Sequence, residues 1–177
     1  MQLEYRICNL SDIDQLIYLS KTTFVASFES QNNPKDFEEY IHFAFSKEKL
    51  TSELSNPNSS FYFVYLGKDL IGYFKLNINN AQTDIKSEEA IELERIYVLG
   101  SFQGMGLGSQ ILDHVRQLAL KTGKSYLWLG VWERNARAIA LYQRNGFKKF
   151  GTHPYLIGDD EQLDWLMRFD LANLSDD

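Results

Sequence analysis

Glycine occupies every second position of the segment Gly104–Gly108, GMGLG, which follows Gln103 and precedes a stretch of helical apolar spacing. Glycine has no Cβ, so the backbone at such positions can approach a bulky ligand closely. The first amides of a helix lack an intrahelical acceptor and carry partial positive charge, which suits them to bind phosphate. The segment therefore predicts a phosphate-binding turn at a helix start, although a tight turn without a ligand would use the same glycines.

Two common nucleotide-binding patterns fit this part of the chain poorly. A dinucleotide fingerprint needs G-x-G-x-x-G early in a Rossmann unit, whereas G-x-G-x-G here follows the fourth expected strand. A P-loop needs G-x-x-x-x-G-K-[ST]; residues 123–125 supply the end of it, but Leu118 stands at the first glycine. The spacing therefore favours a different phosphate-binding family.

A second segment with chemical potential runs from Asn135 to Phe147. Asn135 is a good helix cap and Gly146 a good helix stop. Asn135 and Tyr142 are seven residues apart, about two helical turns, so both lie on one helix face. A phenol with a pKa of about 10 is protonated at neutral pH and can donate a proton.

Together the two segments resemble the signatures of the GNAT superfamily of N-acetyltransferases. Gln103–Gly108 fits Q-x-x-G-x-G, and residues 135–147 meet every fixed position of N-x-x-A-x-x-[LF]-Y-x-x-x-G-F. The resemblance covers Ile91–Phe147, and the order of expected elements extends it to the whole chain. The segments ELERIYV, YLWLGVWERNARAIALYQRNGF and IGDDEQLDWLM are similar to the bacterial PaiA-type spermidine/spermine N-acetyltransferases within that superfamily.

The resemblance implies acetyl-CoA as cosubstrate. Its pantetheine arm would follow the backbone of the fourth strand, and its pyrophosphate would lie on the amides of the glycine segment. Asn135 would hydrogen-bond the arm, unless it serves only as a helix cap. The implied cofactor-binding residues are Ile96, Tyr97, Val98, Gln103, Gly104, Met105, Gly106, Leu107, Gly108, Ser109, Asn135, Ala138 and Tyr142.

The same resemblance suggests the catalytic groups. Tyr142 would protonate the leaving thiolate, the alternative being a packed aromatic with an incidental hydroxyl. Glu94, on the cofactor strand, is the best candidate for the base that takes the amine proton, directly or through water. Glu92 and Glu133 are its rivals, and a solvated or ion-paired role for Glu94 stays open.

Composition limits the classes of ligand and the cellular location that we expect for this protein. The chain of 177 residues is 44% hydrophobic and carries a net charge of −6, which argues against nucleic acid and fits a cationic substrate. Cys8 is the only cysteine, and the histidines stand singly, so no metal site is expected. No apolar run is long enough for a membrane span, and we expect a cytoplasmic protein.

The expected fold is a mixed α/β GNAT domain over residues 1–177, with about seven strands flanked by four or five helices and with strands four and five splayed. Ser11 with Asp14 resembles a capping box at the first helix. Asn79–Glu89 is expected to be a polar, mobile loop. Strands are expected at Leu3–Cys8, Phe61–Leu66, Leu70–Ile78, Ile91–Val98, Tyr126–Val131, Phe147–Gly151 and Leu163–Leu171.

The resemblance implies transfer of acetyl from acetyl-CoA to a primary amine, with a polyamine such as spermidine or spermine as the leading acceptor. The alternatives are protein N-terminal amines, other small amines, or a regulatory module that binds acyl-CoA without turnover. Acceptor ammonium groups could meet the acidic clusters Glu38-Glu39 and Asp159-Asp160-Glu161. The oligomeric state is open, with a homodimer among the options.

Overall fold

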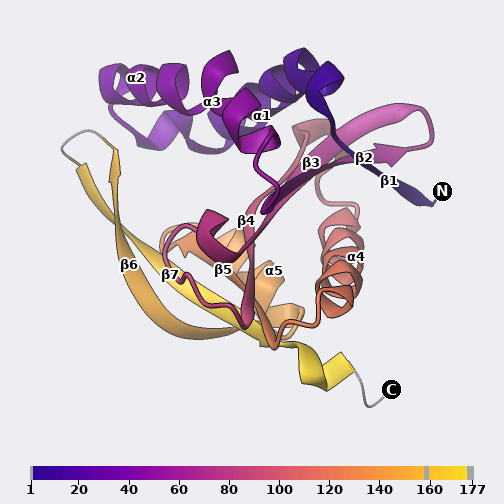
Figure 1. Cartoon of the computed structure of the whole chain (residues 1–177). Helices are drawn as coiled ribbons and strands as arrows, with labels where there is room; N and C mark the ends of the chain where they lie inside the picture. The colour runs from indigo at the N-terminus through magenta and orange to yellow at the C-terminus, as the bar shows by residue number, and fades with distance from the viewer. Residues whose placement is uncertain (1, 158–159, 175–177) are drawn as a thin grey trace. The chain divides into compact units, whose positions relative to one another are not determined.

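A computed structural model describes residues 2–157 and 160–174, which form a seven-stranded sheet with five α-helices (Figure 1). The hydrogen-bonded strand order is β1-β2-β3-β4-β5-β7-β6. Antiparallel and parallel pairs both occur, since β1–β2 and β5–β7 are antiparallel whereas β4–β5 is parallel. The expected mixed sheet is confirmed.

The strands are β1 Leu3–Ile7, β2 Ser59–Leu66, β3 Asp69–Ile78, β4 Ala90–Val98, β5 Tyr126–Trp132, β6 Lys148–Ile157 and β7 Asp160–Asp170. The helices are α1 Ile13–Phe28, α2 Pro34–Ala44, α3 Lys47–Leu54, α4 Leu107–Lys121 and α5 Ala136–Arg144. Short 3-10 turns are η1 Leu10–Asp12, η2 Glu29–Gln31, η3 Asn79–Ala81, η4 Gly100–Phe102 and η5 Leu171–Leu174. The last two strands are longer than the sequence predicts, because β6 and β7 extend toward each other along the hairpin.

The chain forms two compact units. The first comprises Met1–Lys75, Arg95–Gln103 and Leu156–Asp160, and the second comprises Leu76–Glu94, Gly104–Tyr155 and Glu161–Asp177. Strands β3 and β4 each contribute residues to both units. The expectation of a single domain over residues 1–177 stays a prediction.

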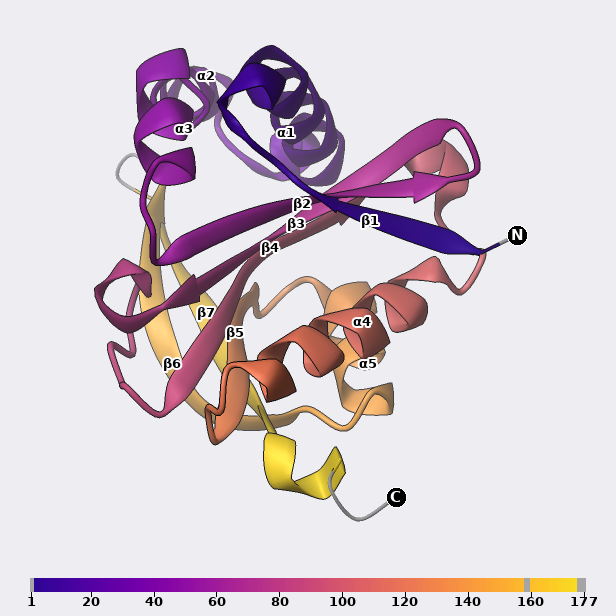
Figure 2. The same ribbon diagram turned by 45° about the vertical axis from the view of Figure 1, so that its right-hand side comes forward.

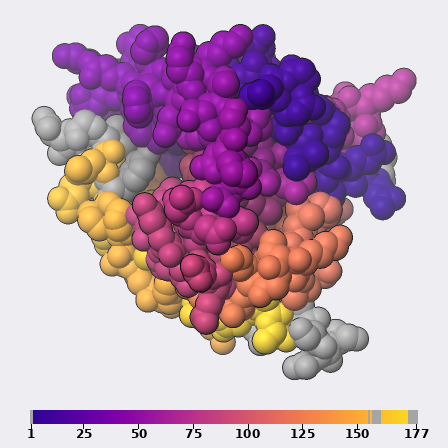
Figure 3. Space-filling model, in the orientation of Figure 1, coloured from indigo at the N-terminus to yellow at the C-terminus, as the bar shows by residue number. Residues whose placement is uncertain are grey.

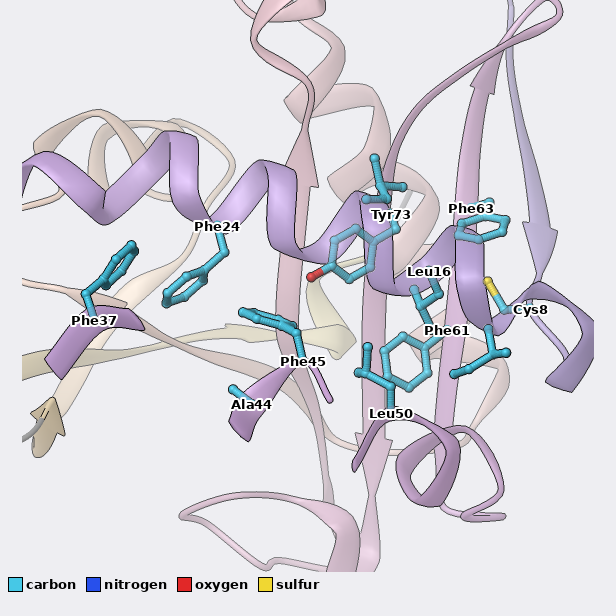
Figure 4. Close-up of a cluster of buried hydrophobic side chains, with 12 residues drawn as sticks. Cys8, Leu16, Phe24, Phe37, Ala44, Phe45, Leu50, Phe61, Phe63 and Tyr73 are labelled. Carbon is cyan, nitrogen blue, oxygen red and sulfur yellow. The ribbon is translucent and has the colours of Figure 1, made fainter. Parts of the chain in front are cut away.

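The first unit is built around an aromatic core between α1–α3 and the strands β2 and β3. Phe24 of α1 stacks on Phe37 and Tyr40 of α2, with ring centroids 5.7 and 5.5 Å apart, and contacts Phe45 at 5.2 Å. Figure 4 shows Phe24, Phe37, Phe45 and Tyr73 within this cluster. In the space-filling view, the indigo and purple residues of the N-terminal part of the chain, which include these helices, lie together (Figure 3). Burial of these side chains stabilises the three helices.

Cys8 belongs to the same core and lies directly after β1 (Figure 4). The thiol is buried, and burial raises its pKa to about 12. A thiolate is the reactive form of cysteine, so this side chain acts as a small apolar core residue.

Local caps explain where the helices of the first unit begin. Asn33 accepts from the amides of Lys35 and Asp36 before α2, and Ser46 accepts from the amide of Lys49 before α3. The expected capping box of Ser11 with Asp14 is wrong. The box is formed two residues earlier, by Asn9 and Asp12, because the chain makes the turn η1 before entering α1.

The second unit places α4 and α5 side by side (Figure 2). Phe147 links α5 to the sheet, since its ring lies 5.8 Å from Tyr142 of α5 and 5.7 Å from Phe169 of β7. Trp128 of β5 is fully buried and packs against Ala90 and Leu166.

The segment Asn79–Glu89 differs from the expected mobile loop. Gln82 is buried, and its Oε1 accepts from Trp128 Nε1 at 2.7 Å while its Nε2 donates to Ser87 O at 2.8 Å. A buried amide with partners on both ends anchors the segment to β5. Its polar composition therefore reflects internal hydrogen bonding as well as solvation.

Strands β4 and β5 separate shortly after they begin. In the part of the chain that the structure describes, their parallel ladder joins Ala90–Tyr126, Ile91–Leu127 and Glu92–Trp128 and then ends. Strand β5 keeps its antiparallel partner β7 as far as Trp132, which pairs with Asp164. The expected splay of the fourth and fifth strands is thus present, and it begins after Glu92 within the second unit.

Candidate active site

The glycine segment adopts the backbone that its composition predicts. Gly104 and Gly106 have φ angles of 82° and 74°, a left-handed conformation that L side chains rarely adopt. Gly106 is the N-cap of α4 and, as a glycine, has no side chain to accept a hydrogen bond from the first amides of that helix. A Cβ at either glycine would meet nothing within 4 Å. The helix start therefore presents uncapped amides behind an open surface.

Gly108 differs from the other two glycines, because it lies where two helices pack closely. A Cβ at this position would lie 3.0 Å from Leu141 Cδ2 of α5. Ser109 strengthens the same junction, because its Oγ accepts from Asn145 Nδ2 at 3.0 Å. The two sequence signatures thus meet physically, one at the start of α4 and the other along α5.

Asn135 caps α5, with its Oδ1 accepting from the amide of Ala138 at 3.1 Å. The capping role that the sequence predicts is confirmed, and it joins two of the expected cofactor residues. The cap uses the oxygen of the side chain and leaves the Nδ2 group as a donor.

Tyr142 lies on α5 and is 7% exposed. Burial raises the pKa of its phenol above the ordinary value of 10. The hydroxyl is therefore protonated throughout the neutral range and can act as a donor or as an acid.

Glu92 and Glu94 of β4 share one partner, Asn77 of β3. Asn77 Nδ2 donates to Glu94 Oε2 at 2.6 Å and to Glu92 Oε2 at 3.0 Å. Thr83 also donates to Glu92, from its amide to Oε2 at 2.9 Å and from its hydroxyl to Oε1. Burial, assisted by the neighbouring Glu94 charge, raises the pKa of Glu92. Glu133, the other rival base, is exposed after the end of β5.

A further acidic group in the second unit was not predicted from the sequence. His153 Nε2 of β6 lies 3.3 Å from Asp84 Oδ1. Burial and the Asp84 charge raise the pKa of Asp164, on β7, to about 6. A Cβ on Gly130 would lie 3.6 Å from Asp164 Oδ2, so this carboxylate lies over β5 beyond the point where β4 departs. Only the spacing of alternate residues on β7 could have signalled it, and that spacing is common to any strand.

The remaining expected cofactor residues are divided between the two units, with Ile96, Tyr97, Val98 and Gln103 in the first. Ile96, Tyr97 and Val98 are partly buried, and Gln103 Nε2 donates to Val98 O at 2.8 Å. The ring of Tyr97 lies 5.8 Å from that of Tyr73 and joins the aromatic core. Met105, in the second unit, is 57% exposed, whereas Leu107 is buried.

The role of the expected acidic clusters stays a prediction. Glu38 and Glu39 are exposed on α2. Asp159 lies outside the described residues, Asp160 begins β7, and Glu161 is exposed. Among the described residues no three His, Cys, Asp or Glu side chains are arranged to hold a metal ion, and no helix there is long and apolar enough to cross a bilayer.

Comparison with known proteins identifies the class. The model of the acetyltransferase (GNAT) family matches residues 16–147. An uncharacterized N-acetyltransferase of Lactobacillus delbrueckii subsp. lactis is 36% identical over 89% of this chain and 91% of its own length. The chain belongs to the GNAT acetyltransferase family, and it is accordingly an N-acetyltransferase whose acetyl donor is acetyl-CoA.

More distant relatives carry named activities. The spermidine N(1)-acetyltransferase of Thermoplasma acidophilum is 26% identical over 84% of this chain and 89% of its own length. The crystal structure of PaiA N-acetyltransferase from that organism with coenzyme A has a TM-score of 0.77 at 24% identity, covering 96% of this chain and 99% of that one. Spermidine N-acetyltransferase of Vibrio cholerae, crystallised with coenzyme A and spermine, has a TM-score of 0.73 at 20% identity, covering 97% and 96%. At these identities the two structures show the fold.

The residues of the second unit fit a coenzyme A pyrophosphate. Positive-φ glycines, open space above them and uncapped helix amides are what such an anion needs. Asn135 adds a donor and Tyr142 a protonated phenol on the adjoining helix.

Proposed function

We propose that this N-acetyltransferase acetylates a primary amine of a polyamine such as spermidine or spermine. The observation that carries the proposal is a connected run of carboxylates in the second unit. Glu94 is joined to Glu92 through Asn77, and Glu92 to Thr83. Asp84 follows Thr83 directly.

Asp84 extends the run toward β6 and β7, where its carboxylate faces His153 and its charge raises the pKa of Asp164. A polyamine carries several ammonium groups at neutral pH, because alkyl amines have pKa values near 10. Only the reacting nitrogen needs to be neutral, and the others favour a surface of excess negative charge. The net charge of −6 for the whole chain acts in the same direction.

Related proteins give independent support. The Thermoplasma relative and the Vibrio structure both bear the name of spermidine acetyltransferases. A homologue named probable spermine N(1)-acetyltransferase in Bacillus subtilis subsp. natto matches 48% of this chain at 29% identity.

The proposed chemistry is direct attack. The amine nitrogen forms a bond to the thioester carbonyl carbon, and the bond from that carbon to sulfur breaks. Glu94 accepts the proton that the amine loses, directly or through water. Tyr142 donates its hydroxyl proton to the leaving thiolate, and its raised pKa keeps that proton in place beforehand.

Cofactor binding in this proposal uses the residues that the family signatures mark. The amides of Gln103–Ser109 would hold the pyrophosphate, and Ile96–Val98, Asn135 and Ala138 would contact the pantetheine arm. Gly106→Val should abolish acetyl-CoA binding while leaving the fold intact, because a valine is strained at a φ of 74° and would cover the amides. Calorimetry with acetyl-CoA checks this, and unchanged affinity would contradict it.

Three alternatives remain to be separated by experiment. Protein N-terminal amines and other small amines are acceptors that the same carboxylates could bind. A regulatory module that binds acyl-CoA without turnover would have no use for a buried, protonated Tyr142 beside the cofactor signature. The cytoplasmic location and the homodimer stay predictions.

The decisive experiment measures thiol release from acetyl-CoA over a panel of spermidine, spermine, a short peptide with a free N-terminus and a neutral monoamine. Spermidine or spermine should give the highest kcat/KM, and added salt should raise KM for them but not for the monoamine. Tyr142→Phe should lower kcat about 100-fold with little change in acetyl-CoA affinity. Equal rates on all amines at every salt concentration would overturn the polyamine assignment, and wild-type turnover by Tyr142→Phe would remove the phenol as the acid.

A further inference from the structure

Asn77 occupies a position in β3 that the reaction as described does not use. Its side chain is fully buried, and its single Nδ2 group donates to two different carboxylates. The Nδ2 group of an asparagine carries two N–H bonds, so both are engaged by Glu92 and Glu94. A buried amide that serves two acids at once is an arrangement with consequences for both of them.

The carboxylates of Glu92 and Glu94 are neighbours because of their spacing on β4. Glu92 and Glu94 are two residues apart on β4, so their side chains lie on the same face of the strand. Like charges at that separation disfavour ionisation, and the Glu94 charge indeed raises the pKa of Glu92. A donor placed between them opposes this effect, because each N–H bond stabilises the anion that accepts it.

The two acids are held differently. Glu92 is 2% exposed and accepts donors from Thr83 as well as from Asn77, so its position is fixed from two elements. Glu94 is partly exposed, and its Oε2 is oriented by Asn77 at 2.6 Å. Glu92 is therefore the anchored member of the pair, and Glu94 is the member that can reach a substrate.

We propose that Asn77 is a positioning residue for acetyl transfer, which orients Glu94 as proton acceptor and allows Glu92 and Glu94 to be ionised side by side. The proposal rests on the assignment of Glu94 as the base. It identifies the carboxamide at position 77 as the group that sets the pH range of the reaction. Glu92 is the ionisable group that shares the Asn77 donor with Glu94. Thr83, which also donates to Glu92, is neutral.

The side-chain chemistry at position 77 allows a sharp substitution. Aspartate has the size of asparagine but no N–H bond to donate, so Asn77→Asp replaces a bridge between two carboxylates with a third carboxylate. Glu94 should then be harder to ionise, and an essential base with a raised pKa loses activity as pH falls. Gln117→Glu adds the same charge at an exposed position of α4 and serves as the matched control.

The experiment measures kcat/KM for spermidine from pH 6 to pH 9.5 in the full-length protein. Asn77→Asp should move the acidic limb upward by at least about one pH unit and lower kcat at pH 7 by about 10-fold or more. KM for acetyl-CoA should be unchanged, and Gln117→Glu should keep the wild-type limb. A second acceptor amine of lower pKa separates the enzyme from the substrate, because a limb that belongs to the amine moves with the amine.

A rescue variant distinguishes positioning from general damage. Glu92→Gln in the Asn77→Asp background returns one carboxamide to the cluster and restores its charge, so the limb should move back toward wild type. If Asn77→Asp does not fold, the double variant and Asn77→Ser carry the test, since serine offers one donor and should still shift the limb. A folded Asn77→Asp protein, or in its place a folded Asn77→Ser protein, with the wild-type limb would overturn the proposal. Wild-type turnover by Glu94→Gln would instead remove the assigned base itself, a distinct failure.

Discussion

Two glutamates in this molecule, Glu53 partly buried and Glu92 buried, have opposite surroundings. Glu53, at the end of α3 in the first unit, lies 2.9 Å from Lys75 Nζ and 3.2 Å from Arg95 Nη2. Glu92, on β4 in the second unit, is contacted by the neutral donors of Asn77 and Thr83 and lies beside another carboxylate. The Glu53 carboxylate is paired with two cations. Within the described part of the chain, the partners of the Glu92 carboxylate are neutral donors.

The difference shows what each carboxylate can do. Glu53 of α3 neutralises the charges of Lys75 on β3 and Arg95 on β4, so its role is to join the helix to these strands. Glu92 keeps an uncompensated charge in a buried place, and its pKa is raised as a result. Carboxylates of this second kind gather where proton transfer or cation binding occurs. Burial alone therefore does not distinguish a structural acid from a functional one, but the charge of its partners does.

The largest expected effect comes from removing the Glu53 carboxylate, which pairs with Lys75 and Arg95 in the first unit. Glu53→Gln should lower the free energy of unfolding by about 3–5 kcal/mol, because it leaves the cations of Lys75 and Arg95 buried without their carboxylate. Urea denaturation at pH 7.5 measures this. Glu92→Gln is the matched control and should lose far less, since it removes a charge that burial already disfavours. Equal losses in both variants would show that the two sites are energetically alike.

A pH series should give the two glutamates different signatures. The folded-state pKa of Glu92 is raised, so its stabilising contribution is complete below its unfolded pKa and is lost as pH rises through the folded value. The Tm of Glu92→Gln should therefore rise relative to the wild-type Tm between pH 5 and pH 8, because the glutamine does not ionise. Thermal unfolding of both proteins across this range tests the sign, and a variant Tm that falls relative to the wild-type Tm as pH rises would contradict it.

Asp164 extends the comparison to a carboxylate that we expect to meet substrate. Its folded pKa of about 6 lies above its unfolded value, so its ionisation destabilises the fold as pH rises from about 4 through 6. After allowance for its partial exposure, Asp164→Asn should raise Tm at pH 8 by about 2–4 °C. The same variant should raise KM for spermidine several-fold, because an ammonium group loses its partner. A more stable protein with unchanged KM would place Asp164 outside the acceptor site.

The smallest effect is expected from Lys49, the more exposed partner of Glu53. Lys49 Nζ lies 3.6 Å from Glu53 Oε1 in an i,i+4 arrangement, with 45% of its side chain exposed. Lys49→Gln should change the free energy of unfolding by less than about 0.5 kcal/mol, as exposed pairs do. Comparison with Glu53→Gln under identical conditions shows how much of the stabilisation by Glu53 comes from its buried partners.

The cofactor half of the site could be predicted from the sequence because its signals are local. Gly104 and Gly106 mark a turn by their conformational freedom, and Asn135 and Tyr142 share a face by helical spacing alone. The role of Gly108 in packing against Leu141 was less accessible, because it depends on how two helices meet.

The carboxylate network could not be predicted in the same way. Asn77, Thr83 and Glu92 come from β3, the segment after η3 and β4, and their pairing depends on tertiary register. The sequence identified Glu94 as a candidate and Glu92 as its rival, whereas the structure makes them partners of one amide. The segment around Gln82 was misjudged for a related reason, since polar residues indicate a loop but not where its hydrogen bonds end.

The solitary cysteine has a practical consequence. Cys8 is buried and its thiol has a pKa of about 12, so the folded protein should not react with a disulfide reagent that detects free coenzyme A. Colour developed during turnover would then report product alone, without background from the catalyst. An unfolded chain exposes one thiol, so the same reagent, added without substrate, counts the fraction of molecules that have lost their structure. One cuvette can thus separate a variant that is inactive from a variant that is unfolded.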